Sequence, residues 1–177
     1  MLGLKVSNLF KTHLSVKDIK VLKRLWFYHL AFSIVFWLYI QYGPGGDAYW
    51  YWINSSKMSL EDALEGFFKS GPGTYAMFLL NLFPAKVLSF FGLSMLYSFL
   101  GYIGMICFYV LFKNNIVYNS KLKSSTLFPL IFFLPNLHFW SAGVGKDTLL
   151  FLCIGLFLYG MQRPAKHIGK LALALVL

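Results

Sequence analysis

Acidic residues are scarce in this chain. Its 177 residues include only six Asp and Glu, against sixteen Lys and Arg, and charged residues make up 12% of the total. A soluble domain has about 25% charged residues and roughly 45–50% apolar residues. Here 58% of the residues are hydrophobic and 20% are aromatic. This composition excludes an ordinary soluble domain and is typical of a protein that resides in a lipid bilayer.

Cysteine is scarce as well. Cys107 and Cys153 both lie in hydrophobic runs without CxxC spacing, so the sequence carries no disulfide or metal signature. The net charge of +10 does not indicate nucleic acid, because the basic residues lie between hydrophobic runs rather than on one polar face. They follow the positive-inside rule instead. We therefore expect membrane lipids as partners, no nucleic acid and no cofactor. The sequence offers no coordination set from which a divalent metal could be argued, so metal dependence stays open.

Long hydrophobic runs divide the chain. We expect transmembrane helices at 25–42, 94–112, 126–140 and 148–161, within a single all-α domain that is a polytopic transmembrane helix bundle. No cleavage pattern follows the first run, so we expect it to be a retained anchor. The last run, 168–177, is too short for a bilayer that requires about 20 residues. We interpret it as the start of a further span in a longer protein.

The basic residues predict an orientation. Residues 1–24 form a basic arm that we expect on the cytoplasmic side. If the run 74–92 lies along the outer surface, twelve basic residues lie inside and three outside, with Lys86 within the run itself. If the run crosses the membrane, the counts are seven and eight. The first arrangement satisfies the positive-inside rule, so we expect 43–92 to form an outer loop.

Local chemistry agrees with an outer loop that carries interface-lying helices. Pro84 and Lys86 would give a spanning helix a kink and a costly charge. Ser59 and Asp62 have the spacing of a capping box that opens a helix. The apolar residues that follow recur at helical spacing, which predicts an amphipathic helix at the membrane surface.

This loop begins with a candidate catalytic acid. Asp47 follows a Gly/Pro turn and precedes a row of Tyr and Trp residues. A carboxylate at this place can act as a general base toward a sugar hydroxyl, while Tyr49 and Trp50 can stack on sugar faces. The alternative interpretation is an interfacial aromatic belt next to a solvated acid.

A second candidate is the short loop 141–147, which the predicted topology places on the same side as Asp47. Lys146 can hold a lipid phosphate or pyrophosphate as a point charge. Asp147 is a candidate for binding substrate, or it caps the helix that follows. His138, just before the loop, is a binding candidate as well, although a lone membrane histidine is more often packed or hydrogen-bonded.

The glycines near Lys146 invite comparison with a phosphate-binding P-loop, but the match fails. Trp140 occupies the position of the first glycine, and Asp147 stands where the motif requires Ser or Thr. The sequence therefore gives no indication of nucleotide hydrolysis.

Together the two motifs resemble those of membrane enzymes of envelope glycan synthesis. GDAYWYW, at 46–52, is similar to the first-loop acidic motif of GT-C-type membrane glycosyltransferases. LPNLHFWSAGVGKDTLLF, at 134–151, resembles a turn in O-antigen and exopolysaccharide polymerases. The resemblance implies a glycosyltransferase or polymerase that uses sugars linked to polyprenyl phosphate or pyrophosphate at the bacterial inner membrane, together with other envelope-glycan assembly proteins.

The resemblance also implies roles for particular residues. Asp47 is the base that deprotonates the acceptor hydroxyl, and Lys146 binds the phosphate of the donor. The usual second acidic pair of the GT-C pattern is missing, since Glu61 and Asp62 are expected in the amphipathic helix. Two alternatives stay open. One is a transporter or flippase, which would favour charges within spans and paired broken helices; the other is a non-catalytic multi-pass membrane protein.

Overall fold

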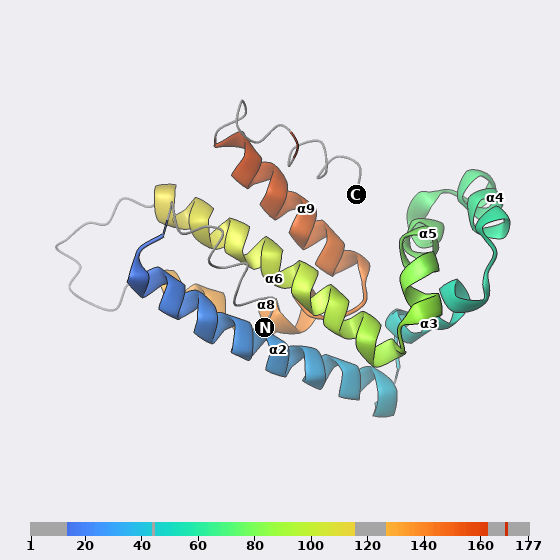
Figure 1. Cartoon of the computed structure of the whole chain (residues 1–177), viewed down its shortest axis with the longest axis horizontal. Coiled ribbons are helices and arrows are strands. Elements are labelled where there is room, and N and C mark those ends of the chain that lie inside the picture. The colour runs from blue at the N-terminus through green and yellow to red at the C-terminus, as the bar shows by residue number, and fades with distance from the viewer. Residues whose placement is uncertain (1–13, 44, 116–126, 163–168, 170–177) are drawn as a thin grey trace.

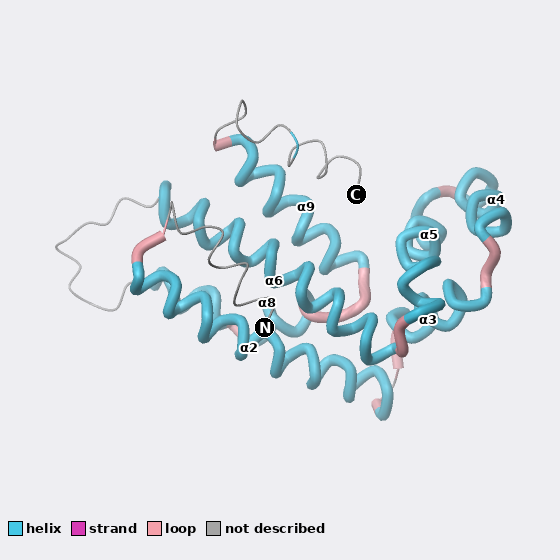
Figure 2. Tube along the Cα trace, viewed as in Figure 1, coloured by secondary structure: helices cyan, strands magenta, loops and turns pink. Residues whose placement is uncertain are grey.

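The computed structural model of the chain describes residues 14–43, 45–115, 127–162 and 169. Within these ranges the chain is helical, with short connecting loops and no strand (Figure 2). The fold class is all-α, as predicted. Most of the predicted further span at 168–177 lies outside the described residues. The helices are α2 (Val16–Tyr42), α3 (Asp47–Lys57), α4 (Leu60–Ser70), α5 (Pro72–Val87), α6 (Phe90–Asn115), α7 (Leu127–Leu130), η2 (Ile131–Phe133), α8 (Pro135–Ser141) and α9 (Lys146–Met161).

The two longest helices, α2 and α6, are the candidate membrane spans. They contain 27 and 26 residues and are apolar enough to cross a membrane. At about 1.5 Å per residue each extends for about 40 Å, which exceeds a hydrocarbon core of about 30 Å. They run side by side in opposite directions (Figure 1). The predicted spans 25–42 and 94–112 lie within these two helices, which supports association with a membrane.

The region predicted as a span at 126–140 is not one continuous helix. It is divided into α7, η2 and α8, and the residue before each of its two prolines is not helical. Phe128 before Pro129, and Leu134 before Pro135, both have ψ near 120°, because a proline ring disfavours the helical conformation of the preceding residue. The run is apolar enough for a span, but its prolines interrupt the helix.

The predicted span 148–161 lies in α9, which has 16 residues. The axes of α8 and α9 meet at an angle of 104°, as in a broken span or a re-entrant loop. If this bent pair counts as one span, the described residues contain up to three candidate spans instead of the four expected.

Three short helices, α3, α4 and α5, make up most of the predicted outer loop and lie at one end of the long helices (Figure 1). The predicted start of an amphipathic helix is confirmed, because the Ser59 hydroxyl accepts a hydrogen bond from the Asp62 backbone N–H at 3.0 Å, at the start of α4. The hydrophobic run 74–92 is divided between α5 and the first turn of α6. It is therefore not one continuous helix.

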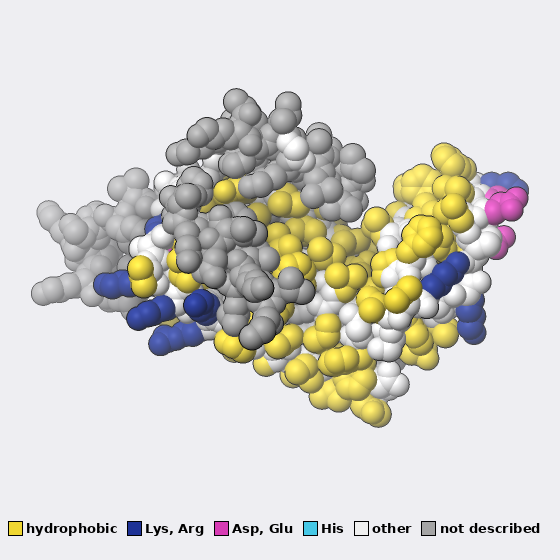
Figure 3. Space-filling model, in the orientation of Figure 1, with side chains coloured by type: hydrophobic (Ala, Val, Ile, Leu, Met, Phe, Trp, Pro, Cys, Tyr) yellow, Lys and Arg dark blue, Asp and Glu magenta, His cyan; other side chains and the backbone are white. Residues whose placement is uncertain are grey.

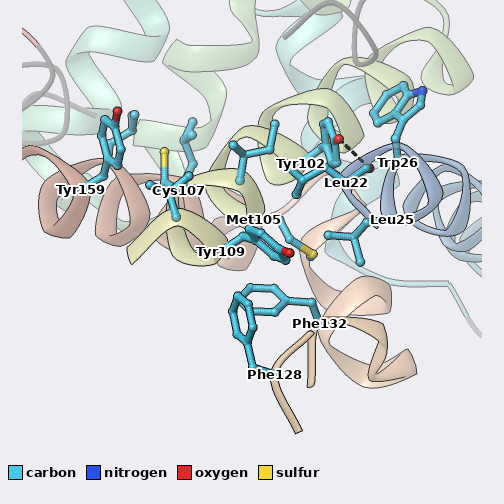
Figure 4. Close-up of a cluster of buried hydrophobic side chains, with 14 residues drawn as sticks. Leu22, Leu25, Trp26, Tyr102, Met105, Cys107, Tyr109, Phe128, Phe132 and Tyr159 are labelled. Atoms are coloured by element: carbon cyan, nitrogen blue, oxygen red, sulfur yellow. Dashed lines mark hydrogen bonds between the residues drawn. The ribbon is translucent and has the colours of Figure 1, made fainter. Parts of the chain in front are cut away.

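Aromatic side chains build the core between α2, α6 and the segment 127–133 (Figure 4). The Tyr102 hydroxyl donates a hydrogen bond to the backbone carbonyl of Leu22 at 2.8 Å, and the Tyr102 ring packs against Trp26. About two turns further along α6, Tyr109 packs on Phe128 and Phe132. This core fixes α2 against α6 over much of their length.

The helices α6 and α9 pack closely where glycines face each other. A Cβ atom added to Gly104 would lie 3.0 Å from the Leu152 Cα atom, and one added to Gly155 would lie 3.0 Å from the Gly104 carbonyl oxygen. The two helices can approach this closely because neither glycine carries a side chain.

Charged side chains gather at the two ends of the molecule. Four exposed basic residues lie in the first part of α2, and acidic side chains lie over α4, while hydrophobic side chains cover much of the visible face between them (Figure 3). The basic residues are Lys17, Lys20, Lys23 and Arg24. At the same end, an ion pair between Asp18 and Lys113 joins the start of α2 to the end of α6.

Candidate functional site

Two helices begin after glycines at the candidate site. Asp47 is the first residue of α3, after Gly46, and Lys146 is the first residue of α9, after Gly145. Neither glycine can donate or accept through a side chain, so the N–H groups of both first turns have no side-chain cap. Gly45 has a φ of 80°, which favours glycine, and it allows the sharp turn from α2 into α3.

The turns bring Asp47, Lys146 and Asp147 to one cavity of about 390 Å³. The cavity lies where the C-terminal end of α2 meets the starts of α3 and α9. Asp47 and the Lys146–Asp147 pair are far apart in the sequence, and all three side chains are exposed to solvent. The other lining residues are Phe36, Tyr39, Ile40, Gly45, Gly46, Ala48, Tyr51, Trp140, Gly143, Val144 and Gly145.

The charges in this cavity are unevenly matched. Lys146 is the one basic residue among the described residues that line it, and two carboxylates line the same cavity. The helix dipoles partly offset the imbalance, because the carboxylates of Asp47 and Asp147 lie in the first turns of α3 and α9, where negative charge is favoured. No group of three or more His, Cys, Asp or Glu in the described part of the chain is arranged to hold a metal ion.

Tyr51 is a cavity residue that the sequence motifs did not single out. Its side chain is 4% exposed, and the Lys146 Nζ atom lies 6.0 Å from the centroid of its ring. The signal was its spacing, since Asp47 and Tyr51 lie four residues apart on one helix and therefore share a face. The ring forms an apolar wall next to the charged groups.

The other two aromatic candidates lie on α3 outside the cavity. Tyr49 and Trp50 line a neighbouring hollow of about 530 Å³, which shares Gly45 and Gly46 with the cavity. Tyr49 packs edge-on to Phe90, 5.4 Å between centroids. The Trp50 ring lies against a core residue of α5, and both rings stay about half exposed. The structure thus places them next to the cavity that contains Asp47 but not in it.

His138 is fully buried and lies outside the cavity. Its Nδ1 atom is 2.9 Å from the Nδ1 atom of His29, and its Nε2 atom is 2.6 Å from the carbonyl oxygen of Phe132. A substrate in the cavity does not reach it in this arrangement. His29 was missed in the sequence, although it belongs to the buried stripe of α2 that includes Trp26 and Ser33 at helical spacing.

The turn before Lys146 is fixed to α2 and to its own helix. The Ser33 hydroxyl donates to the carbonyl of Ala142 at 3.1 Å, and the Thr148 hydroxyl donates to the carbonyl of Gly143 at 2.6 Å. A side chain at Gly143 would overlap the ring of Phe36. These contacts set the position of Lys146 relative to α2 and therefore relative to Asp47.

An apolar groove continues from the cavity. A hollow of about 470 Å³ shares Trp140 and Asp147 with the cavity and is otherwise lined mainly by apolar residues of α8 and α9. A third hollow of about 260 Å³ shares Leu137 and Phe151 with it and extends along α6 to Phe112. The charged cavity thus lies at one end of a continuous apolar surface.

Comparisons of the chain with protein-family models, with curated proteins and with solved structures found no match. The functional interpretation therefore depends on the cavity and on the short motifs around Asp47 and Lys146.

Proposed function

We propose that the chain belongs to a polytopic membrane glycosyltransferase or polymerase that transfers a sugar from a polyprenyl phosphate or pyrophosphate carrier during envelope polysaccharide synthesis. One observation carries the proposal. Asp47, which follows the first candidate span, and Lys146, which lies in the bend between α8 and α9, line the same cavity. Each belongs to one of the two motifs that resemble those of such enzymes.

The chemistry requires a base and a stabilising charge on opposite sides of the sugar. Asp47 accepts the proton of the acceptor hydroxyl while the oxygen forms a bond to the anomeric carbon. The bond from that carbon to the carrier phosphate breaks, and the phosphate leaves with the electron pair. Lys146 and the uncapped N–H groups of α9 then stabilise the phosphate charge. Asp147 is a candidate for holding a sugar hydroxyl near the same turn.

The apolar groove supports a lipid-linked donor over a soluble one. The groove begins at Asp147 and continues past Leu137 and Phe151, so a phosphate near Lys146 has apolar surface next to it. A lipid chain in this groove contacts protein on one side and bilayer on the other. A soluble nucleotide sugar has no group that would use this surface.

The proposed placement in the membrane has the basic start of α2 in the cytoplasm and α3, α4 and α5 at the outer interface of a bacterial inner membrane. Exposed basic residues at one end support it under the positive-inside rule. The amphipathic α4 supports it as well, because its apolar side chains Leu60, Leu64 and Phe68 are exposed along one stripe. Such a stripe suits the boundary between headgroups and acyl chains.

The test is sugar transfer in membranes that contain the full-length protein, with polyprenyl-linked donor added and expression matched between variants. Loss of a general base lowers a rate by about 10²–10⁴-fold, so we expect a loss in this range for Asp47→Asn. For Lys146→Ala we expect a loss of at least about tenfold, because the leaving phosphate loses its cationic partner.

Matched controls are available on the same helical cap. Glu61→Gln on α4 and Lys57→Ala at the end of α3 change exposed charges outside the cavity, and we expect normal transfer with both. Undiminished transfer by both Asp47→Asn and Lys146→Ala would contradict the proposal. The acid would then be a solvated residue of the aromatic belt, and the lysine a tether at the membrane surface.

A transporter or flippase is the second candidate, and the 104° break between α8 and α9 favours it. Broken helices often form the substrate sites of transporters. The two functions differ in a measurable way. If the protein is a flippase, Asp47→Asn stops movement of the lipid-linked sugar from one leaflet of a vesicle to the other. Sugar transfer from donor that is already in the acceptor-side leaflet then stays normal.

A further inference from the structure

Two buried histidines face each other between α2 and α8. The Nδ1 atoms of His29 and His138 lie 2.9 Å apart, and both side chains are inaccessible to solvent. The remaining nitrogen of each ring faces a backbone carbonyl oxygen. His29 Nε2 lies 3.0 Å from the oxygen of Ser98, and His138 Nε2 lies 2.6 Å from that of Phe132. All three separations are hydrogen-bond distances.

The number of protons that this arrangement requires can be counted. A carbonyl oxygen only accepts, so each Nε2 must carry a hydrogen to donate to its carbonyl. The contact between the two Nδ1 atoms requires one more hydrogen, on either ring. Three hydrogens on the four nitrogens of two imidazoles give one neutral ring and one imidazolium. A neutral pair has only two hydrogens and leaves one contact in which two lone pairs face each other.

We propose that His29 and His138 form a buried proton-binding site, in which one proton is shared between the two Nδ1 atoms and the pair carries a single positive charge. Burial opposes this charge, because it removes the imidazolium from water. Three features offset that opposition: hydrogen bonds to two carbonyl oxygens, a hydrogen bond between the rings, and sharing of the charge over both rings. A proton fits the 2.9 Å gap between the Nδ1 atoms better than a metal ion does. A zinc ion at about 2.0–2.1 Å from each nitrogen holds its ligands farther apart at tetrahedral angles.

The groups around the pair are aromatic. On α2, Tyr28 lies edge-on to His138 with 4.7 Å between the ring centroids, and Phe32 lies at 5.9 Å. On α6, Tyr102 lies 6.3 Å from His29, and its hydroxyl is bonded to the Leu22 carbonyl. Among the contacts of the described residues, no Asp, Glu, Lys or Arg side chain reaches either imidazole, so the shared proton has no counter-ion there.

The histidine pair is connected to the cavity through α8. The pair joins α2, α6, η2 and α8 at one point, and α8 leads directly into the turn that precedes Lys146. Gly101 makes room for this junction, because a Cβ atom there would overlap the Ser141 carbonyl and lie 3.3 Å from His29 Nε2. Release of the proton leaves facing lone pairs that repel, and α8 then separates from α2. The occupancy of this site thus sets the position of the turn, whatever reaction the cavity supports.

The experiment counts the protons directly. Full-length protein with nitrogen-15-labelled histidine is reconstituted in lipid vesicles, and its ring nitrogens are followed by NMR between about pH 5 and 8, where histidine charge normally changes. At the acid end we expect three protonated nitrogens and one bare nitrogen from the pair. A cross-peak that links both Nδ1 atoms through one shared proton identifies the pair in the unmodified protein.

The variant His29→Gln provides the control. A glutamine amide can donate to both the Ser98 carbonyl and His138 Nδ1, so we expect the shared-proton signal to disappear and His138 to stay neutral across the range. The cross-peak is measured in the unmodified protein, so the test stands even if the His29→Gln variant fails to fold. Two protonated nitrogens at every pH, or one equivalent of metal retained by the purified protein, would overturn the proposal.

Discussion

The Lys146 ammonium lies 6.0 Å from the centroid of the Tyr51 ring, so the first residue of α9 lies next to the second turn of α3. This distance is at the outer limit for a cation–π interaction, which contributes about 0.5–1 kcal/mol at exposed sites. The contact therefore positions Lys146 more than it stabilises the fold. The contact brings together α3 and α9, which are far apart in the sequence.

Two substitutions of Tyr51 distinguish the contribution of its ring from that of its hydroxyl. Tyr51→Phe keeps the ring beside Lys146, so we expect a change in unfolding free energy within about 0.5 kcal/mol and normal transfer. Tyr51→Leu removes a buried aromatic ring and leaves a partial cavity, so we expect a loss of about 1–3 kcal/mol. Denaturant unfolding in detergent micelles measures both. Equal losses for Phe and Leu would show that the hydroxyl, not the ring, is what the site uses.

The Asp18–Lys113 ion pair is expected to stabilise the packing of α2 on α6. The Tyr109 hydroxyl also donates to the Asp18 carboxylate, at 3.0 Å, and the carboxylate is largely covered. Asp18→Asn removes the charge but keeps a side chain of the same shape, and we expect it to lower the unfolding free energy by about 1–3 kcal/mol. Glu65→Gln is the matched control, because its ion pair with Lys69 is exposed and should matter by less than about 0.5 kcal/mol.

This carboxyl also predicts a dependence on pH. Asp18 precedes the hydrophobic stretch of α2. Burial raises its pKa, but hydrogen bonds from Lys113, Ser15 and Tyr109 outweigh burial and hold the pKa below the usual 3.8. A depressed pKa gives stabilisation that is fully present above the usual value and is lost as the pH falls through the folded-state value. Wild-type and Asp18→Asn protein should therefore converge in stability in acid below about pH 4. A difference that stays constant as the pH falls well below about 4 would exclude this contribution.

Close packing of α6 on α9 predicts the effect of a side chain at Gly104. Its added Cβ atom would lie 3.0 Å from both the Leu152 Cα atom and a ring carbon of Phe151. We expect Gly104→Val to lower the unfolding free energy by about 1–3 kcal/mol, because the helices must separate. Gly73→Ala in α5 meets nothing within 4 Å and should be neutral or slightly stabilising. Thermal unfolding of both variants in one detergent tests this contrast.

Hydropathy predicted the all-helical class and the positions of the two long helices, because long apolar runs without prolines form continuous helices. It did not predict the division of 126–140. The residues before Pro129 and Pro135 leave the helical conformation, and an average over hydrophobicity does not detect that effect. The bend between α8 and α9 is a separate feature at residues 142–145, and it places Lys146 in the cavity.

The candidate site was predictable only in part, because sequence patterns give no distances between segments. Charge counting predicted that Asp47 and Lys146 lie on one side of the membrane but gave no distance between them. Residues of a helix are offset by about 100° each, so Tyr49 lies almost opposite Asp47. Tyr51 and Trp50 flank Asp47 on its two sides, and only tertiary packing shows that Tyr51 is the one in the cavity. His29 carries no motif at all, and its partner lies far away in the sequence. Only tertiary packing reveals that pair.

The central claim is that Asp47 and Lys146 belong to one cavity, and crosslinking in membranes tests it without reference to activity. Both residues are replaced by Cys in a protein whose Cys107 and Cys153 are changed to Ala, and a short bifunctional thiol reagent is added. A matched pair moves the first cysteine to Lys57, about 15 Å further along α3. We predict an internal crosslink for the Asp47→Cys, Lys146→Cys protein and none for the Lys57→Cys, Lys146→Cys protein. Equal crosslinking of both pairs, or of neither, would contradict the account.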